Sequence, residues 1–187
     1  AGELITQDFQ LYRYCELVND PVELKIDSPF TPQAPWARIN ISSDERTAWL
    51  PKSTARGQYA NNLNVSLSSA LLDFSSVEHA VLSFDQRCQT ESGYDYGIIE
   101  VRRDAGAWAE LARCSGESSW QHVELDVSQL LGSNAAEIRF RFTSDSSVTS
   151  WGWGLDNIAL KVMGDGCRSA QQGPDVFSDG FEGVTGR

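Results

Sequence analysis

The chain has 187 residues, and its 15 lysines and arginines against 26 aspartates and glutamates give a formal charge of −11 at pH 7. This acidic excess would repel a phosphate backbone, so nucleic acid is not an expected partner. No run of about 20 apolar residues occurs, so no membrane span is predicted, and the length suits one domain with a sizeable core.

The N-terminal third contains few regular patterns. Residues 1–20 alternate weakly between apolar and polar side chains and end in a turn signal, which indicates a leading strand or hairpin arm. Residues 22–27 alternate strictly, which predicts a strand. The three prolines of residues 28–36 predict a loop without regular pairing. Residues 37–70 are polar, which indicates irregular loops with short strands around Ala48 and Val65.

Stronger strand patterns follow from residue 80. Ile138, Phe140 and Phe142 alternate with Arg139 and Arg141, as expected for a sheet with one buried and one solvated face. Similar patterns predict strands over 81–88, 96–103, 107–114, 123–127, 138–142 and 155–162. Because no convincing long helix accompanies them, the fold class is predicted to be all-β, a two-sheet antiparallel β-sandwich of jelly-roll type.

The composition divides the chain into three parts. We expect an N-terminal arm over 1–21, the β-sandwich domain over 22–163, and a flexible C-terminal tail over 164–187, where Gly, Ser, Gln and Asp predominate. The chain begins without a basic and apolar leader, so either a signal peptide has been removed or the chain is a piece of a longer exported product.

The four cysteines form no Cys-x-x-Cys or mixed Cys/His cluster, which argues against zinc and favours two disulfides. If strands 81–88, 96–103 and 107–114 run up, down and up, Cys88 and Cys114 finish at the same end of the sheet. Antiparallel pairing of strands 22–27 and 155–162 would likewise bring Cys15 near Cys167. The predicted bridges are therefore Cys88–Cys114 and Cys15–Cys167, which imply a secreted or extracytoplasmic protein.

No catalytic residues are predicted. The two histidines, His79 and His122, lie beside no nucleophile signature such as Gly-x-Ser-x-Gly. The strand acids alternate with core residues, as acids on a solvated face do, so they do not indicate a glycosidase pair. We therefore expect a protein that is not an enzyme, although it can be an appendage of a secreted protease.

Calcium is the predicted metal, because loop carboxylates suit this hard cation. If strands 22–27 and 155–162 pair, Asp27 approaches Asp156 and Asn157, and Asp95 is a further candidate ligand. The alternative is that Asp156 caps a turn or accepts backbone hydrogen bonds.

Aromatic spacing gives the predicted ligand-binding residues. Trp151 and Trp153 lie two positions apart and so would point to one side of an extended chain, and Tyr94 and Tyr96 have the same spacing. Exposed rings of this kind stack on sugars or anchor protein partners, whereas buried ones would close the end of the sandwich.

An ordered series of aromatic, Gly and Asp positions resembles the MAM-like jelly-roll domains, which are appended to secreted bacterial proteases of the immune inhibitor A type and to other exported proteins. The matching segments are Trp36, Thr47–Trp49, Tyr59–Leu67, Leu82–Phe84, Glu91–Gly97, Glu100–Val101, Trp108, Arg139–Asp145 and Gly152–Ile158. The resemblance implies a non-catalytic accessory module, sometimes with structural calcium. The chain departs from it in its four cysteines and in Asn157, where a second acid is frequent.

These observations predict an accessory module of a secreted bacterial protein that acts in adhesion or substrate binding. The expected partners are an extracellular protein or glycan surface and a neighbouring domain of a longer precursor. Two alternatives stay open, a structural module that stabilises an attached protease and a small secreted hydrolase with an unrecognised site.

Overall fold

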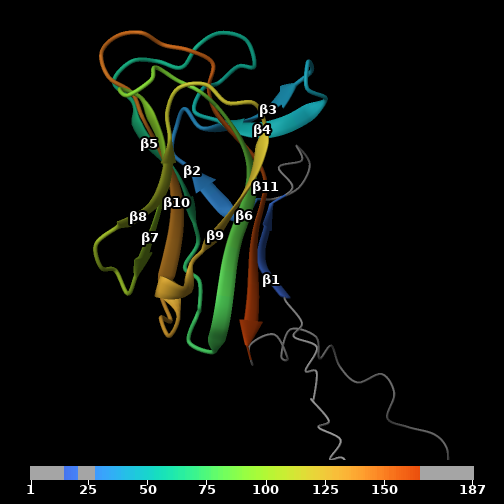
Figure 1. The fold of residues 1–187 in the computed structure, drawn as a ribbon, viewed down its shortest axis with the longest axis vertical. Coiled ribbons are helices and arrows are strands. Elements are labelled where there is room, and N and C mark those ends of the chain that lie inside the picture. Colours follow the sequence, from blue (N-terminus) through green and yellow to red (C-terminus); the bar gives the residue numbers. More distant parts are fainter. Residues whose placement is uncertain (1–14, 21–27, 165–187) are drawn as a thin grey trace, which may run out of the picture.

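The computed structural model describes residues 15–20 and 28–164. Two antiparallel sheets pack face to face (Figure 1). Sheet A runs in the order β3 (Ala37–Ile41), β4 (Arg46–Leu50), β11 (Gly152–Gly164), β6 (Val77–Gln89) and β9 (Gln121–Asp126), and β1 (Cys15–Asp20) also pairs with β11. Sheet B runs in the order β2 (Phe30–Pro32), β5 (Asn64–Ser69), β10 (Ala136–Thr143), β7 (Tyr96–Arg103) and β8 (Ala109–Cys114).

The strand order is that of a jelly roll. The spatial orders β4-β11-β6-β9 and β5-β10-β7-β8 place eight consecutive strands in two four-stranded layers. Every connection from β4 to β11 crosses between the sheets, except the hairpin from β7 to β8. The predicted all-β sandwich of jelly-roll type is confirmed.

The core fills the space between the sheets, and β10 shows how the sequence builds it. Ile138, Phe140 and Phe142 are at most 1% exposed, whereas Arg139 and Arg141 lie on the outer face of sheet B. The same alternation along β6 and β11 buries their apolar side chains against those of β10. Removal of apolar surface from water, as in this core, is the main driving force for folding.

Two strands differ from the sequence prediction. β2 lies in the proline-rich segment, where no regular pairing is predicted, yet Phe30–Pro32 pairs with Leu67–Ser69 of β5. Because β2 is an edge strand, Pro32 does not need to donate to a further neighbour. β3 lies in a segment predicted as irregular, and it pairs along its whole length with β4. β4 and β5 lie where short strands are predicted, around Ala48 and Val65.

The outer edge of β11 has two different neighbours. β4 pairs at Leu155, and β1 pairs over Ile158–Val162 (Figure 1). Part of the predicted N-terminal arm therefore belongs to sheet A. Residues 21–27, and with them the predicted strand and Asp27, lie outside the described residues.

One disulfide joins the two sheets. Cys88 of β6 in sheet A is bonded to Cys114 of β8 in sheet B, with 6.4 Å between the Cα atoms. This confirms the first predicted bridge. The second cannot be followed because Cys167 lies outside the described residues. In the part of the chain that is described, no helix has the length and apolar character needed to cross a bilayer.

Candidate functional site

Trp151 and Trp153 do not share a side of the chain as their spacing predicts. Gly152 between them has φ of 114°, a conformation that breaks the extended chain. The alternation rule holds only for an extended strand, so the two rings go to different places. Trp153 joins the main core between the sheets, and Trp151 packs beside a smaller apolar cluster on the outer face of sheet A.

Trp153 is a core residue and not a ligand-binding one. Its side chain is 0% exposed, and its ring lies 6.0 Å from Trp36 and 5.9 Å from Phe140, centroid to centroid. Its Nε1 donates a hydrogen bond to Gln86 Oε1 at 2.9 Å, which satisfies the one polar group of the buried indole. The predicted contact of Trp153 with a ligand is therefore wrong.

The two predicted tyrosines lie near the start of β7. Tyr94 is 63% exposed and open to a partner. Tyr96 is half-buried, its hydroxyl donates to the Gly93 carbonyl oxygen at 2.6 Å, and its ring lies 5.1 Å from the Arg113 guanidinium. A role in ligand binding stays a prediction for both.

A second pair of aromatic rings covers the outer face of sheet A. Trp120 meets Trp151 edge to face, with centroids 6.4 Å apart, and both rings lie over Gly154 of β11. The Arg46 guanidinium stacks 4.5 Å from the Trp120 ring, and that of Arg87 stacks 4.7 Å from the Trp151 ring. The rings and cations hold one another in place, so this surface is preorganised.

A groove of about 470 Å³ opens beside Trp120, and we call it the Trp120 groove. It lies between the β3–β4 turn, the end of β6 and the β8–β9 connection, and its lining residues are Asp44, Arg87, Gln89, Glu117, Ser118, Ser119 and Trp120. Sequence reasoning missed it because its residues come from three distant segments. The isolated Trp120 after a Ser-rich run is the one local signal.

Asp44 organises the groove. One of its carboxylate oxygens accepts hydrogen bonds from Trp120 Nε1 at 2.8 Å and from Arg87 at 3.0 Å. The hydrogen bond from Trp120, followed by contributions from Ser43 and Arg87, holds the pKa of Asp44 below its ordinary value, although burial opposes the change. The carboxylate therefore stays ionised and its acceptor geometry is fixed.

The predicted calcium ligands Asp156 and Asn157 belong instead to an ion-pair network. Arg46 Nε lies 3.3 Å from Asp156, and Arg46 also contacts Asp85 at 3.1 Å. Asn157 and His122 each bond to Asp85 at 2.9 Å. The guanidinium neutralises the carboxylate that is predicted to hold the ion, and an uncharged asparagine adds no compensating charge. A calcium ion at Asp156 and Asn157 stays a prediction, and its third ligand, Asp27, lies outside the described residues.

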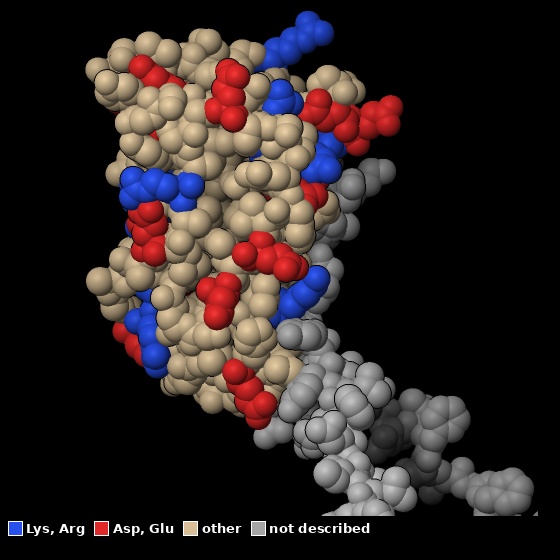
Figure 2. Space-filling model, viewed as in Figure 1, with Lys and Arg blue, Asp and Glu red and all other residues tan. Residues whose placement is uncertain are grey.

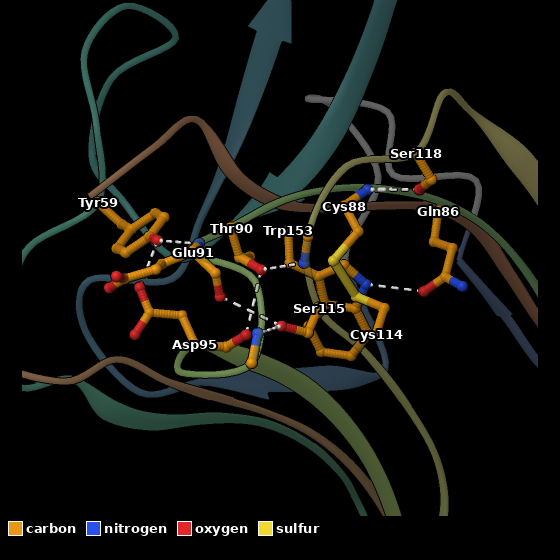
Figure 3. The surroundings of a disulfide bond; sticks show 12 residues. Tyr59, Gln86, Cys88, Thr90, Glu91, Asp95, Cys114, Ser115, Ser118 and Trp153 are labelled. Carbon is orange, nitrogen blue, oxygen red and sulfur yellow. Dashed lines mark hydrogen bonds between the residues drawn. A yellow bond between two sulfur atoms is a disulfide. The ribbon is translucent and has the colours of Figure 1, made fainter. Parts of the chain in front are cut away.

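Asp95, the other predicted ligand, lies in a different acidic cluster beside the disulfide (Figure 3). Carboxylate oxygens of Glu91, Asp95 and Asp145 all lie within 4.8 Å of one another. Asp95 is 0% exposed; it accepts a hydrogen bond from the Tyr59 hydroxyl and another from the Asp145 amide at 2.8 Å. The oxygen of the Tyr59 hydroxyl in turn accepts a hydrogen bond from the Glu91 amide at 3.1 Å.

Glu91 is the incompletely satisfied member of this acidic cluster. Its Oε2 atom is buried and has no hydrogen-bond partner among the described residues. Burial, together with the negative charges of Asp145 and Asp95, raises the pKa of Glu91. Three hard oxygen donors, one of them unpartnered, suit a cation such as calcium. Sequence reasoning found Asp95 alone, because Glu91 and Asp145 are brought to it by the fold.

Comparison with known proteins adds a distant relative. No family model matches the chain. A stretch of 106 residues, which is 56% of the chain, is 29% identical to Bacillopeptidase F of Bacillus subtilis (strain 168). That stretch spans 7% of the length of Bacillopeptidase F, so the similarity concerns a small segment of a much longer protein. The MAM-like resemblance is not confirmed and stays a prediction.

Solved structures share the fold at low sequence identity. The K3 cleaved adhesin domain of Lys-gingipain from Porphyromonas gingivalis W83 superposes with a TM-score of 0.52 and 12% identity, covering 78% of this chain and 99% of that domain. CBM29_1, a family 29 carbohydrate binding module from Piromyces equi, gives a TM-score of 0.47 and 12% identity, covering 82% and 92%. The chain is thus similar in fold to the adhesin domain, and in sequence to one segment of a longer protein.

Proposed function

We propose that the chain is a non-catalytic accessory module of a longer secreted protein and that it binds an extracellular glycan or protein surface through the Trp120 groove. The observation that carries this proposal is the groove itself, in which an aromatic ring, a fixed carboxylate and a fixed guanidinium face one opening.

The chemistry of the groove suits recognition. Indole rings stack on the apolar face of a sugar or pack on a protein side chain, while planar Asp, Arg and Gln side chains bond to hydroxyl or amide groups. The volume falls within the range of about 300–1,000 Å³ that is usual for ligand sites. Because Asp44 and Arg87 are already paired, the groove presents polar groups without a large net charge.

Two further observations support the context. The Cys88–Cys114 disulfide favours an oxidising compartment outside the cytoplasm. The similarity to a short segment of Bacillopeptidase F favours a module within a longer chain. The MAM-like resemblance of the sequence points the same way.

The test is binding of the isolated chain to a glycan array and to extracellular matrix proteins, followed by titration calorimetry with any ligand found. Trp120→Ala is expected to weaken binding about tenfold or more, since one stacked ring contributes roughly 1–2 kcal/mol. Leu71→Ala, at an apolar residue that is 65% exposed, is the control and should change affinity less than about twofold.

Other results would favour the alternatives. Turnover of casein or of a generic glycoside by the isolated chain would contradict the non-catalytic role. If no binding is detected in any assay and the chain stabilises an attached protease domain, the purely structural module is favoured.

A bound structural calcium ion is a second proposal, and the unpartnered Glu91 oxygen beside Asp95 and Asp145 favours it. An ion there would offset two of the three negative charges of these carboxylates and hold the β6–β7 loop to the segment that follows β10. Ligands bound only by the folded state stabilise it by mass action, by about 2.7 kcal/mol at 100 times Kd.

The calcium proposal is tested by comparing thermal unfolding at low ionic strength in calcium and in chelator. Calcium is expected to raise the Tm of the wild type and to have a much smaller effect on Glu91→Gln. Glu124→Gln, which removes one charge from an exposed position on β9, should respond like the wild type. Equal Tm values of the wild type in calcium and in chelator would show that the chain binds no structural calcium ion.

A further inference from the structure

The outer face of sheet B carries four arginines and three glutamates in a connected array (Figure 2, where blue and red side chains alternate on the side formed by sheet B). Two of the cations have one acidic partner each: Arg102 bonds to Glu137 at 2.7 Å, and Arg113 bonds to Glu110 at 2.5 Å. The remaining arginines share a single carboxylate, so one positive charge on this face is not balanced by the array.

The surplus charge lies at Arg139 and Arg141. Both donate from Nε to the same oxygen of Glu100, at 2.7 and 2.8 Å, and Arg141 also donates to the other oxygen at 2.9 Å. Glu100 is 6% exposed, so both guanidinium groups are anchored at a buried carboxylate. The side chain of Arg139 is 21% exposed, and its two terminal amino groups have no hydrogen-bond acceptor among the described residues.

The indole ring of Trp108 stacks on the guanidinium group of Arg139. The Arg139 guanidinium is 3.9 Å from the indole centroid, and that of Arg102 is 4.6 Å away. Stacking of this kind fixes the plane of a guanidinium while its N–H groups project from the edge. Trp108 is half-buried, so part of the residue is accessible to solvent.

Hydroxyl groups lie beside the cation on the neighbouring strands. Ser68 of β5 is directly opposite Arg139, and Thr31 of β2 is opposite Ser68. Ile98 of β7, on the same outer face, is 5% exposed and offers a peptide side chain little apolar surface. The array therefore combines one anchored cation with uncommitted donors, one indole and a row of hydroxyls.

We propose that this surface binds a carboxylate-bearing polysaccharide, with a uronate carboxylate on the terminal amino groups of Arg139 and a sugar ring against Trp108. A guanidinium binds a carboxylate through paired N–H donors, and an indole stacks on the C–H face of a sugar. The site is separate from the Trp120 groove, which lies on the outer face of sheet A. It supplies attraction to an acidic polymer that the formal charge of −11 would otherwise repel.

The test is affinity electrophoresis and calorimetry of the full chain with polygalacturonate in calcium-free buffer. Highly methyl-esterified pectin is the matched ligand, because it keeps the sugar rings and loses most of the carboxylate charge. Polygalacturonate is expected to bind at least tenfold more tightly than the ester, and its binding should weaken when NaCl rises from about 50 to about 500 mM. Equal binding of the two polymers would overturn the proposal.

Arg139→Gln is the decisive variant. It should fold, since Glu100 keeps two hydrogen bonds from Arg141, and it is expected to weaken polygalacturonate binding about tenfold. Arg56→Gln removes the same charge from an exposed loop outside sheet B and should change affinity less than about twofold. Equal losses in the two variants would show that net charge alone matters and would contradict the site.

Two further outcomes separate this site from other interpretations. If polyglutamate binds as tightly as polygalacturonate, the surface recognises charge and not an acidic sugar, and the proposal is wrong. If Trp120→Ala abolishes binding of the polymer while Arg139→Gln does not, the acidic sugar binds in the Trp120 groove. The proposed function then stands and this second site does not.

Discussion

Trp153 packs directly against Gly97 in the core. A Cβ atom built at Gly97 would lie 2.6 Å from Cε3 of the Trp153 ring, so the indole occupies the space that any other residue would need. The large ring on β11 and the missing side chain on β7 therefore have to occur together.

Gly97→Ala is expected to destabilise the protein by about 2–3 kcal/mol, because the added methyl group overpacks a rigid core. Gly93→Ala is the control: a Cβ there meets nothing within 4 Å, although φ is 81°. It should cost only about 1 kcal/mol for the left-handed backbone. Denaturant unfolding measures both, and equal losses would show that packing against Trp153 is not tight.

Tyr59 connects the acidic cluster to the core. It is 2% exposed, and its hydroxyl donates to Asp95 while it accepts the Glu91 amide. Tyr59→Phe is expected to cost about 1–3 kcal/mol, since it deprives a buried carboxylate of a donor. Tyr94→Phe, at a side chain that is 63% exposed, should change the free energy of unfolding by less than about 0.5 kcal/mol.

Lys52 gives the protein a pH dependence on the alkaline side. It is 5% exposed, and burial together with the nearby charge of Arg87 lowers its pKa to about 8 from 10.5. Between these two values the unfolded chain binds more protons at this residue than the folded one, so stability contributed by Lys52 rises with pH.

Lys52→Met should remove this contribution. The difference in unfolding free energy between wild type and variant is expected to shift in favour of the wild type by about 2 kcal/mol from pH 8 to pH 10. Chemical denaturation at several pH values measures the difference. Curves that stay parallel would show that Lys52 is charged in the folded protein at pH 8.

At the level of elements, the apolar patterns from residue 80 onward were enough to predict the strands there. β6, β7, β8, β10 and β11 lie where the sequence places them, and all of these except β8 bury side chains in the main core. β2 was missed because it has three residues and lies in a proline-rich segment, and β3 was missed because it lies in a polar segment interpreted as irregular. Short strands of this kind are determined by their partners and not by their own sequence.

The candidate sites were less predictable than the strands. The rule that residues two apart share a side failed at Trp151 and Trp153, because Gly152 rotates the chain between them. The partners of Asp95 could not be predicted either, since Asp145 lies fifty residues away in the sequence and only the fold brings its amide to Asp95. Local patterns determine strands, whereas the topology determines which side chains meet.

The disulfide is an element-scale constraint with a measurable effect. Cys88 and Cys114 are 26 residues apart, and closing a loop of this size in the unfolded chain contributes about 3 kcal/mol. The double variant C88A/C114A is expected to lose about that much stability in denaturant unfolding. A loss in unfolding free energy below about 1 kcal/mol would show that the disulfide adds little to the stability that packing between the sheets already provides.

At the scale of the whole molecule, the last strand completes the first sheet. β11 lies between β4 and β6 in sheet A and adds five residues to the core, Trp153, Leu155, Ile158, Leu160 and Val162. Each buried side chain of this size contributes about 1.5–3 kcal/mol, so together they match the entire stability of an ordinary domain.

A chain truncated after Ser150 is therefore expected to lack a cooperative unfolding transition. Near-ultraviolet circular dichroism and a thermal melt, compared with the full chain, measure this. Retention of a native-like spectrum and a sharp transition by the truncated chain would contradict the central role assigned to β11.

The bond between Cys88 and Cys114 also has a mechanical consequence. If the domain is pulled from its two ends, the segment between the cysteines, which are 26 positions apart, cannot be extended. At about 3.5 Å per extended residue, its contour is shorter by about 90 Å than that of the reduced chain. A module tethered to a surface would therefore extend less under tension when the disulfide is intact. Single-molecule stretching with and without reductant would measure this difference in extended length.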